Sequence, residues 1–382
     1  MGDGRHGIKT GLVWLGLFHL AYFCIDRYAG TAGIKGVVYP DSTPVGGDFI
    51  NLWTVARLVL TGRAADIYRV GDFMAYQATL TGGADIGLRL WAYPPHSLLL
   101  AWPFGLVGYY TALLAWSLAG LAVLAAGARR FGFDARETAV LLLSPATVLN
   151  LYHGQTGSFA AGVLLLALSA RGRADPVSVG AAALLTLKPQ TGFLLPVLWA
   201  FQRRWREIAW TALATVAFVG LALAVFGAGP WRDYVGDTLP VLGLLEREGS
   251  GPFMTMIPSV FMSMRIVSGN PTIALAVHGG FAVAVAIFLL WRLRTVSAGE
   301  RQASILLLAT VLITPYMHNY DLVLLLCGAL LVARRWAAAP RQPAGSDMLV
   351  LVAWAMPQLV VLLNTAGLPI APLLILPLLL LA

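Results

Sequence analysis

Long apolar runs divided by short clusters of arginine constrain this chain more than any other feature of its sequence. Hydrophobic residues make up 58% of its 382 residues and charged residues only 12%, against roughly 25% charged residues in a typical soluble domain. Runs such as 109–128, 207–226 and 272–291 are long enough to cross the roughly 30 Å hydrocarbon core of a bilayer as helices. The sequence therefore predicts an all-α, polytopic integral membrane protein.

The basic residues indicate orientation in the membrane. A net charge of +8 in a soluble chain would suggest nucleic acid, but here the arginines lie between apolar runs, so we expect no nucleic-acid partner. All the clusters can share the cytoplasmic face if the chain makes about 12 crossings, the first of them at 10–25 and the last two at 347–363 and 367–382. The clusters are Arg5/Lys9, Arg129/Arg130/Arg136, Arg171/Arg173, Arg203/Arg204/Arg206, Arg292/Arg294/Arg301 and Arg334/Arg335/Arg341.

Between these clusters the chain makes predicted helical hairpins that end in polar turns. The hairpins pair 137–151 with 155–170, 177–187 with 190–201, and 302–316 with 319–333. A helix of about 12 residues cannot cross a core of roughly 30 Å, so the outer ends should meet around a cavity within the membrane. Lipid would penalise a charged residue there by about 3 kcal/mol or more. The turns carry His153, Gln155, Lys188, Gln190, His318, Asn319, Tyr320 and Asp321.

Two segments are too interrupted to be read as crossings. If 94–108 also crossed the membrane, Arg129 and Arg130 would lie on the extracytoplasmic side, so we expect 94–108 to be a re-entrant or interfacial helix. The same count of crossings, applied to Arg292 and Arg294, makes 256–270 a second re-entrant candidate. Its Arg265 could hold a phosphate through two parallel hydrogen bonds, or its side chain could reach a lipid headgroup by snorkelling.

A polar segment, Gly46 to Pro95, stands out from its apolar surroundings and falls in a predicted first extracytoplasmic loop at 28–92. Asp48 follows two glycines and precedes an amphipathic run to Leu60. Such an aspartate can cap the first turn of a helix, or it can carry chemistry. Spacing alone leaves both interpretations open.

Several motif classes are missing from the chain. It has no phosphate-binding glycine loop, no zinc-type cysteine pair and no Asp-x-Asp, which would cradle a metal-bound nucleotide diphosphate. Cys24 and Cys327 both lie inside apolar spans, which indicates neither a disulfide nor a metal site. A metal-bound nucleotide-sugar donor is therefore not expected.

Six short motifs follow one another in order between about 10 and 335: Asp48-Phe49, Asp66-Ile67-Tyr68, Tyr93-Pro94-Pro95, Gly154-Gln155, Lys188-Pro189-Gln190 and His318-Asn319-Tyr320-Asp321. This ordered set resembles glycosyltransferase family 87 of the GT-C superfamily, which includes polyprenol-phosphate-mannose-dependent α-1,2-mannosyltransferases. The resemblance implies one GT-C transmembrane domain over 1–382, an aspartate in the first extracytoplasmic loop as catalytic base, and a lipid-phosphate sugar donor. The second predicted extracytoplasmic loop, 227–255, is compact, so the resemblance says less about where the sugar acceptor binds.

A polyprenyl-monophosphate sugar carries its own leaving group, so its transfer needs a base and cations, and no metal or cofactor. We expect Asp48 to act as the base at the extracytoplasmic face of the plasma membrane. A lipid or glycolipid would accept the sugar, with mannose the favoured donor sugar, and membrane lipids would surround the enzyme. The donor and its phosphate would be held by Lys188, His318, Arg265 and Gln190, and the cavity lined by Tyr93, Gln155, Asn319 and Tyr320.

Two other classes of protein remain as alternatives. A secondary transporter or flippase also uses broken helices with polar turns at the midplane, but here the polar turns share one face and no inverted repeat is evident. A lipid-binding assembly protein would explain a cavity, but not the combination of Asp48, Lys188 and His318.

Overall fold

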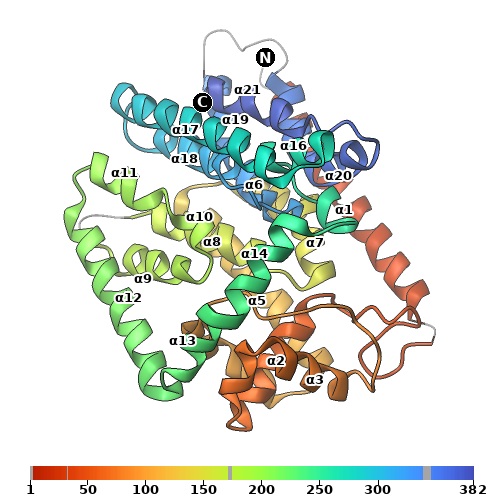
Figure 1. Ribbon diagram of the computed structural model, residues 1–382. Helices are drawn as coiled ribbons and strands as arrows, with labels where there is room; N and C mark the ends of the chain where they lie inside the picture. The colour runs from red at the N-terminus through yellow and green to blue at the C-terminus, as the bar shows by residue number, and fades with distance from the viewer. Residues whose placement is uncertain (1–2, 32, 171–173, 339–345) are drawn as a thin grey trace.

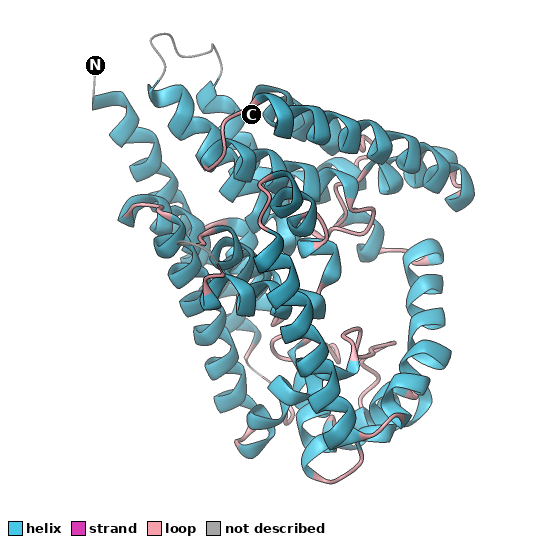
Figure 2. Ribbon diagram, turned by 90° about the vertical axis from the view of Figure 1, so that its left-hand side faces the viewer, coloured by secondary structure: helices cyan, strands magenta, loops and turns pink. Residues whose placement is uncertain are grey.

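The computed structural model describes residues 3–31, 33–170, 174–338 and 346–382. Every extended regular element in these ranges is helical (Figures 1 and 2), and pairing of the β type is limited to isolated bridges at Lys35–Val38 and Val38–Pro44. The prediction of an all-α chain is therefore confirmed for the described residues.

The first half of the chain folds into helices before, within and after the polar loop. They are α1 (Asp3–Gly30), α2 (Phe49–Leu60), α3 (Val70–Leu80), α4 (Leu98–Ala101), α5 (Tyr109–Phe131), α6 (Ala135–Leu142), α7 (Pro145–His153) and α8 (Gly157–Leu168). The following stretch contains α9 (Pro176–Leu184), α10 (Pro189–Gly192), α11 (Leu195–Phe201), α12 (Trp205–Phe226), α13 (Gly229–Asp233), α14 (Leu239–Glu248), α15 (Pro252–Thr255) and α16 (Val260–Ser268). The last helices are α17 (Pro271–Thr295), α18 (Glu300–Ile313), α19 (Val323–Ala338), α20 (Ser346–Thr365) and α21 (Ala371–Leu381).

Four helices in the described ranges are long and apolar enough to cross a membrane: Tyr109–Phe131, Trp205–Phe226, Pro271–Thr295 and Asp347–Thr365. Only 6% of the apolar stretch of α12 lies buried inside the protein, so its apolar side chains need a lipid environment. The protein is therefore a membrane protein. The total of about 12 crossings stays a prediction.

Several predicted spans are divided into shorter helices. The span 137–151 consists of α6 and α7, separated where Ser144 caps α7 and Pro145 occupies its first turn. The segment 94–108 forms only short turns, η2 (Pro95–Ser97), α4 and η3 (Trp102–Leu106), and 256–270 contains only α16. Nine helical residues rise about 14 Å, so α16 cannot span the core alone; the re-entrant position of 256–270 stays a prediction.

The main hydrophobic core surrounds the hairpin of α18 and α19. Every α18 residue from Gln302 to Leu312 is buried, as expected for a helix that is apolar on all sides. A second cluster joins α2 and α3 to the segment from Trp91 to Ala112. In Figure 1 this cluster lies at the lower end of the molecule, while α18, α19 and α21 lie at the upper end.

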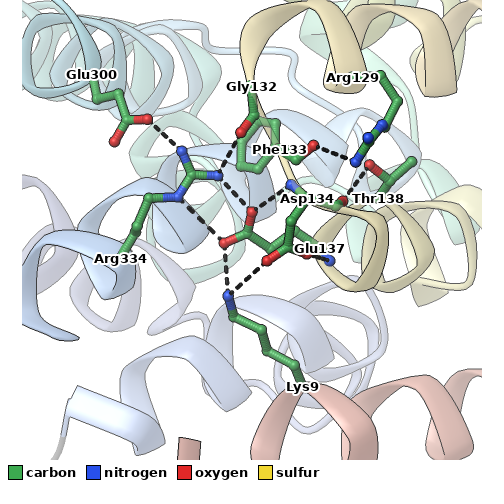
Figure 3. A network of polar contacts seen from close by, with 9 residues as sticks. All are labelled: Lys9, Arg129, Gly132, Phe133, Asp134, Glu137, Thr138, Glu300 and Arg334. Carbon is green, nitrogen blue, oxygen red and sulfur yellow. Dashed lines mark hydrogen bonds and ion pairs between the residues drawn. The ribbon is translucent and has the colours of Figure 1, made fainter. Parts of the chain in front are cut away.

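A polar network ties three distant segments together at the upper end (Figure 3). The buried Glu137 of α6 accepts a hydrogen bond from Lys9 of α1 at 2.7 Å and another from Arg334 of α19 at 2.5 Å. Asp134 and Glu137 form the capping box that starts α6. The network therefore includes one residue from each of the first, second and last basic clusters: Lys9, Arg129 and Arg334. They lie at one end of the bundle, as the prediction of a common cytoplasmic face requires.

Candidate active site

Asp48 occupies the position before α2, yet its side chain makes no capping hydrogen bond. Its backbone N–H donates to the carbonyl of His153 at 2.9 Å. The carboxylate accepts from Arg89 at one oxygen and from Gln155 Nε2 at the other, at 2.5 Å. The side chain keeps 44% of its surface exposed. Asp48 therefore presents a paired but accessible carboxylate rather than a helix cap.

A glycine at 154 makes this arrangement possible. Gly154 ends α7 in the left-handed conformation, with φ +59°, which favours glycine. A Cβ there would lie 2.4 Å from the Cβ of Phe49 and 2.6 Å from the carbonyl oxygen of Gly46. The turn between α7 and α8 can therefore pack directly on the start of α2, which brings Gln155 against Asp48.

Two polar cavities meet beside Asp48. The small one, of about 150 Å³, is lined by Asp48 and Gln155 together with Trp116. The large one, of about 960 Å³, has the size of a ligand pocket. Tyr93 and Tyr320 line both cavities and so form the boundary between them. The polar lining of the large cavity includes His96, Thr186, Lys188, Gln190, Glu246, His318 and Asp321.

Lys188 supplies the positive charge of the large cavity. It follows the short helix η4 (Leu185–Leu187) and precedes Pro189, and its side chain is 11% exposed. Its ammonium lies 2.5 Å from Asp321, 3.4 Å from the Thr156 hydroxyl and 5.5 Å from the centre of the Tyr320 ring. Asp321 itself is only 3% exposed. The charge of Lys188 is thus balanced and its position is held from two directions.

Aromatic side chains continue the wall. His318 stacks on Tyr320 with ring centroids 5.0 Å apart and contacts Phe253 edge-on at 5.4 Å. The Tyr93 hydroxyl shares a 2.6 Å hydrogen bond with Thr156. Flat aromatic faces with hydroxyl and imidazole groups at their edges suit a ligand that has both apolar and polar faces, as a sugar does.

Asn319 and Arg265, both expected at the site, lie elsewhere. Asn319 is buried and donates to the carbonyl of Pro357 at 3.1 Å, so it fastens the turn to α20. The neighbouring His318, Tyr320 and Asp321 line the large cavity. Arg265 lies on α16, 9% exposed, with its Nη1 atom buried and without a hydrogen-bond partner in the described structure. It lines neither cavity.

Besides His96 and Thr186, the site contains Asp321, Glu246, Arg89 and Thr156, none of which was predicted as a site residue. Asp321 could have been recognised as the lone carboxylate of its polar turn, and Glu246 as a carboxylate in an apolar helix. Burial raises the pKa of Glu246 to about 7. Arg89 and Thr156 gave no sequence signal, because the loop holds several arginines and threonine is common in turns.

A third cavity, of about 270 Å³, is almost wholly apolar. Its wall is formed mainly by Leu100, Phe104, Trp116, Val123, Phe159 and Leu184. Tyr93, Thr156 and Lys188 also line it, so this apolar space shares residues with the polar site.

Comparison with known proteins identifies the class. Residues 91–315 match the family model of glycosyltransferase family 87. Searches of curated proteins and of solved structures gave no match. The matched range begins at the end of the polar loop, contains the turns with Gln155 and Lys188, and stops just before His318; Asp48 and Arg89 precede it. An apolar helical fold together with this match defines a membrane glycosyltransferase. The chain belongs to glycosyltransferase family 87.

Proposed function

We propose that the protein transfers a sugar, with mannose the first candidate, from a polyprenyl-monophosphate donor to a lipid or glycolipid acceptor. The observation that carries this proposal is the Asp48 carboxylate, which caps no helix and instead faces a small cavity beside the larger cavity that Lys188 lines. Family membership favours transferase activity over the transporter and flippase alternative.

The reaction follows from the positions of these groups. The oxygen of an acceptor hydroxyl attacks the anomeric carbon, its proton passes to Asp48, and the bond from the anomeric carbon to the phosphate oxygen breaks. The phosphate leaves with the bonding electrons. Arg89 and Gln155 each hold one oxygen of Asp48, and each oxygen has a second lone pair to receive the proton. They therefore orient the base without blocking it.

Lys188 is the group best placed to stabilise the leaving phosphate. An ammonium has three donors, of which one is directed to Asp321 and one, more weakly, to Thr156. The third remains for a phosphate oxygen in the large cavity. His318 and Gln190 line the same cavity and would contact the donor, whereas the position of Arg265 does not support a direct role.

The apolar cavity supports a lipid-linked donor. It offers a hydrocarbon-lined space whose wall includes Lys188 and Tyr93, so a polyprenyl chain there would place its phosphate at the polar site. The amphipathic α2, with its buried face on the second core cluster, would lie at the membrane surface and guide the lipid.

We place the site on the extracytoplasmic side of the plasma membrane, in one domain over 1–382 with about 12 crossings and loops at 28–92 and 227–255. Support comes from the basic network around Glu137, which lies at the opposite end of the bundle from α2 and α3 (Figures 1 and 3). By the positive-inside rule that end is cytoplasmic.

The test is a transfer assay with the purified protein. Radiolabelled polyprenyl-phosphate mannose, and other polyprenyl-phosphate sugars, are incubated with membrane-lipid extracts as acceptors, with and without a chelator of divalent metals. We expect transfer from a polyprenyl-phosphate donor that the chelator leaves unchanged. Transfer from a nucleotide sugar alone would contradict the proposal.

A further inference from the structure

An arginine-rich cavity lies far from the glycosyl-transfer site. It has a volume of about 270 Å³ and is lined by Glu300, Arg301, Ser304, Leu331, Arg334 and Arg335. These residues come from the start of α18 and the end of α19. Asp321 lies just before the start of α19, and 14 helical residues from Asp321 to Arg335 rise about 20 Å, so this cavity is separate from the cavities around Lys188.

The positive charge in this cavity exceeds the negative charge. Arg334 is already bound, to Glu137 and to Glu300 (Figure 3). Arg335 donates to backbone oxygens of Leu381 and Ala382 and forms no ion pair with a side-chain carboxylate of the described residues. The guanidinium of Arg301 has no hydrogen-bond or ion-pair partner within the described ranges, and its Nε atom is buried.

A further arginine lies on α17, which packs on α18, although it does not line the cavity. Arg292, near the end of α17, also has a buried Nε atom without a hydrogen-bond partner in the described structure. Its charge acts on both Arg301 and Arg335, and that of Arg301 acts on Arg335. Guanidinium groups from three helices thus repel one another, and two of them, those of Arg301 and Arg335, line the cavity. An anion in the cavity would reduce this repulsion.

The chemistry of the cavity selects a phosphate. Guanidinium groups present paired N–H donors that match phosphate oxygens, and basic pockets between membrane helices on the cytoplasmic side suit the headgroups of anionic lipids. Leu331 is the apolar residue of the lining. Exposed apolar side chains occur on the adjoining elements: Trp291, next to Arg292, is 54% exposed, and Leu381, whose backbone oxygen accepts from Arg335, is 40% exposed. We propose that this cavity binds the phosphate group of an anionic phospholipid, with Arg301 as the central contact and Arg292 and Arg335 beside it.

The test uses the full chain, purified in a neutral detergent and freed of lipid. Thermal unfolding is followed while phosphatidylglycerol, phosphatidylcholine or inorganic phosphate is added separately. We expect phosphatidylglycerol to raise the unfolding temperature and phosphatidylcholine to leave it unchanged. Arg301→Gln should weaken the phosphatidylglycerol effect about tenfold or more in apparent affinity, since a charge-assisted contact is lost.

Arg294→Gln is the matched control, because Arg294 is an exposed arginine near the same end of α17 and does not line the cavity. It should bind phosphatidylglycerol like the unaltered protein. Without anions, Arg301→Gln should unfold at the same or a higher temperature, since one repelling charge is gone. Arg292→Gln removes a charge that acts on Arg301 and Arg335 from outside the lining, and it should weaken the phosphatidylglycerol effect in the same direction.

Each outcome decides the proposal. An Arg301-dependent effect of phosphatidylglycerol that inorganic phosphate does not reproduce supports a lipid headgroup site. An equal Arg301-dependent effect of inorganic phosphate retains the phosphate site but assigns it to a soluble ligand. Equal losses in Arg301→Gln and Arg294→Gln, or equal effects of the two lipids, would overturn the proposal.

Discussion

The ammonium of Lys188 lies 2.5 Å from the carboxylate of Asp321, although the two residues are 133 positions apart in the chain. The pair joins the turn before α10 to the turn before α19, and both side chains are largely buried. Removing one partner therefore has two consequences, one for stability and one for chemistry. An experiment on either residue has to separate them.

For Lys188→Ala we expect loss of most turnover together with destabilisation by about 3–5 kcal/mol, because Asp321 is left buried without its cation. In the double variant Lys188→Ala/Asp321→Asn the stability should largely return, since no buried charge is left, while turnover stays low. Thermal unfolding and transfer rate, measured on the same samples, check this. Turnover that recovers together with stability would assign Lys188 a purely structural role.

Asp48→Asn should reduce turnover by about 10²–10⁴, the range for loss of a general base. Folding and donor binding should stay unchanged, because asparagine can keep one accepted hydrogen bond and the carboxylate caps no helix in the structure. Turnover, unfolding temperature and donor affinity are to be measured together. Asp72→Asn serves as the control, since Asp72 is an exposed carboxylate of the same loop. Turnover of Asp48→Asn close to that of the unaltered protein would remove Asp48 as the catalyst.

Gly154→Ala tests the contact that positions Gln155. The new Cβ would lie 2.4 Å from the Cβ of Phe49, at a residue with φ +59°, so the turn must move away from α2. We expect a cost of about 1–3 kcal/mol and a loss of turnover, read from unfolding and transfer assays. Gly180→Ala in α9 has no atom within 4 Å of its new Cβ and should be neutral or slightly stabilising. Similar behaviour of the two variants would contradict the close approach at Gly154.

Glu246 should make stability depend on pH. Burial raises the pKa of its carboxyl from 4.5 to about 7, so between these values the folded protein holds a proton that the unfolded chain releases. Its contribution to the free energy of unfolding therefore falls as the pH rises through this window. Unfolding temperatures measured across the window should show the decline, and Glu246→Gln should flatten it. Glu248→Gln removes an exposed carboxylate from the same helix and should leave the decline in place.

Topology can be tested with single cysteines at exposed positions, in a background without the exposed Cys24. Cysteines at Ala75 and Ser250 should react with an impermeant maleimide added to intact cells, and cysteines at Ala135 and Ser297 only after lysis. All four positions are exposed in the structure, so a lack of reaction reports sidedness rather than burial. Labelling of the last two positions in intact cells would contradict a cytoplasmic basic end.

Local patterns in the sequence were sufficient for the class of fold. Uninterrupted apolar runs predict membrane helices whatever their partners, because the cost of placing polar groups in lipid depends on each segment by itself. The same argument marked the turns around Gln155, Lys188 and His318 as cavity walls. It could not show where the helices break, since the division of 137–151 at Ser144 and Pro145 depends on capping geometry.

Local sequence patterns were enough to predict an all-helical membrane protein with polar turns and to draw attention to Asp48. They could not predict which side chains meet in the folded chain: Arg89 and Gln155 with Asp48, and Asp321 with Lys188. The tertiary structure also turns Asn319 toward α20. Such contacts join residues tens to hundreds of positions apart, and the direction of each side chain follows from the backbone conformation of its turn. The local apolar pattern predicts neither the long-range contacts nor the side-chain directions, because both depend on how the helices pack.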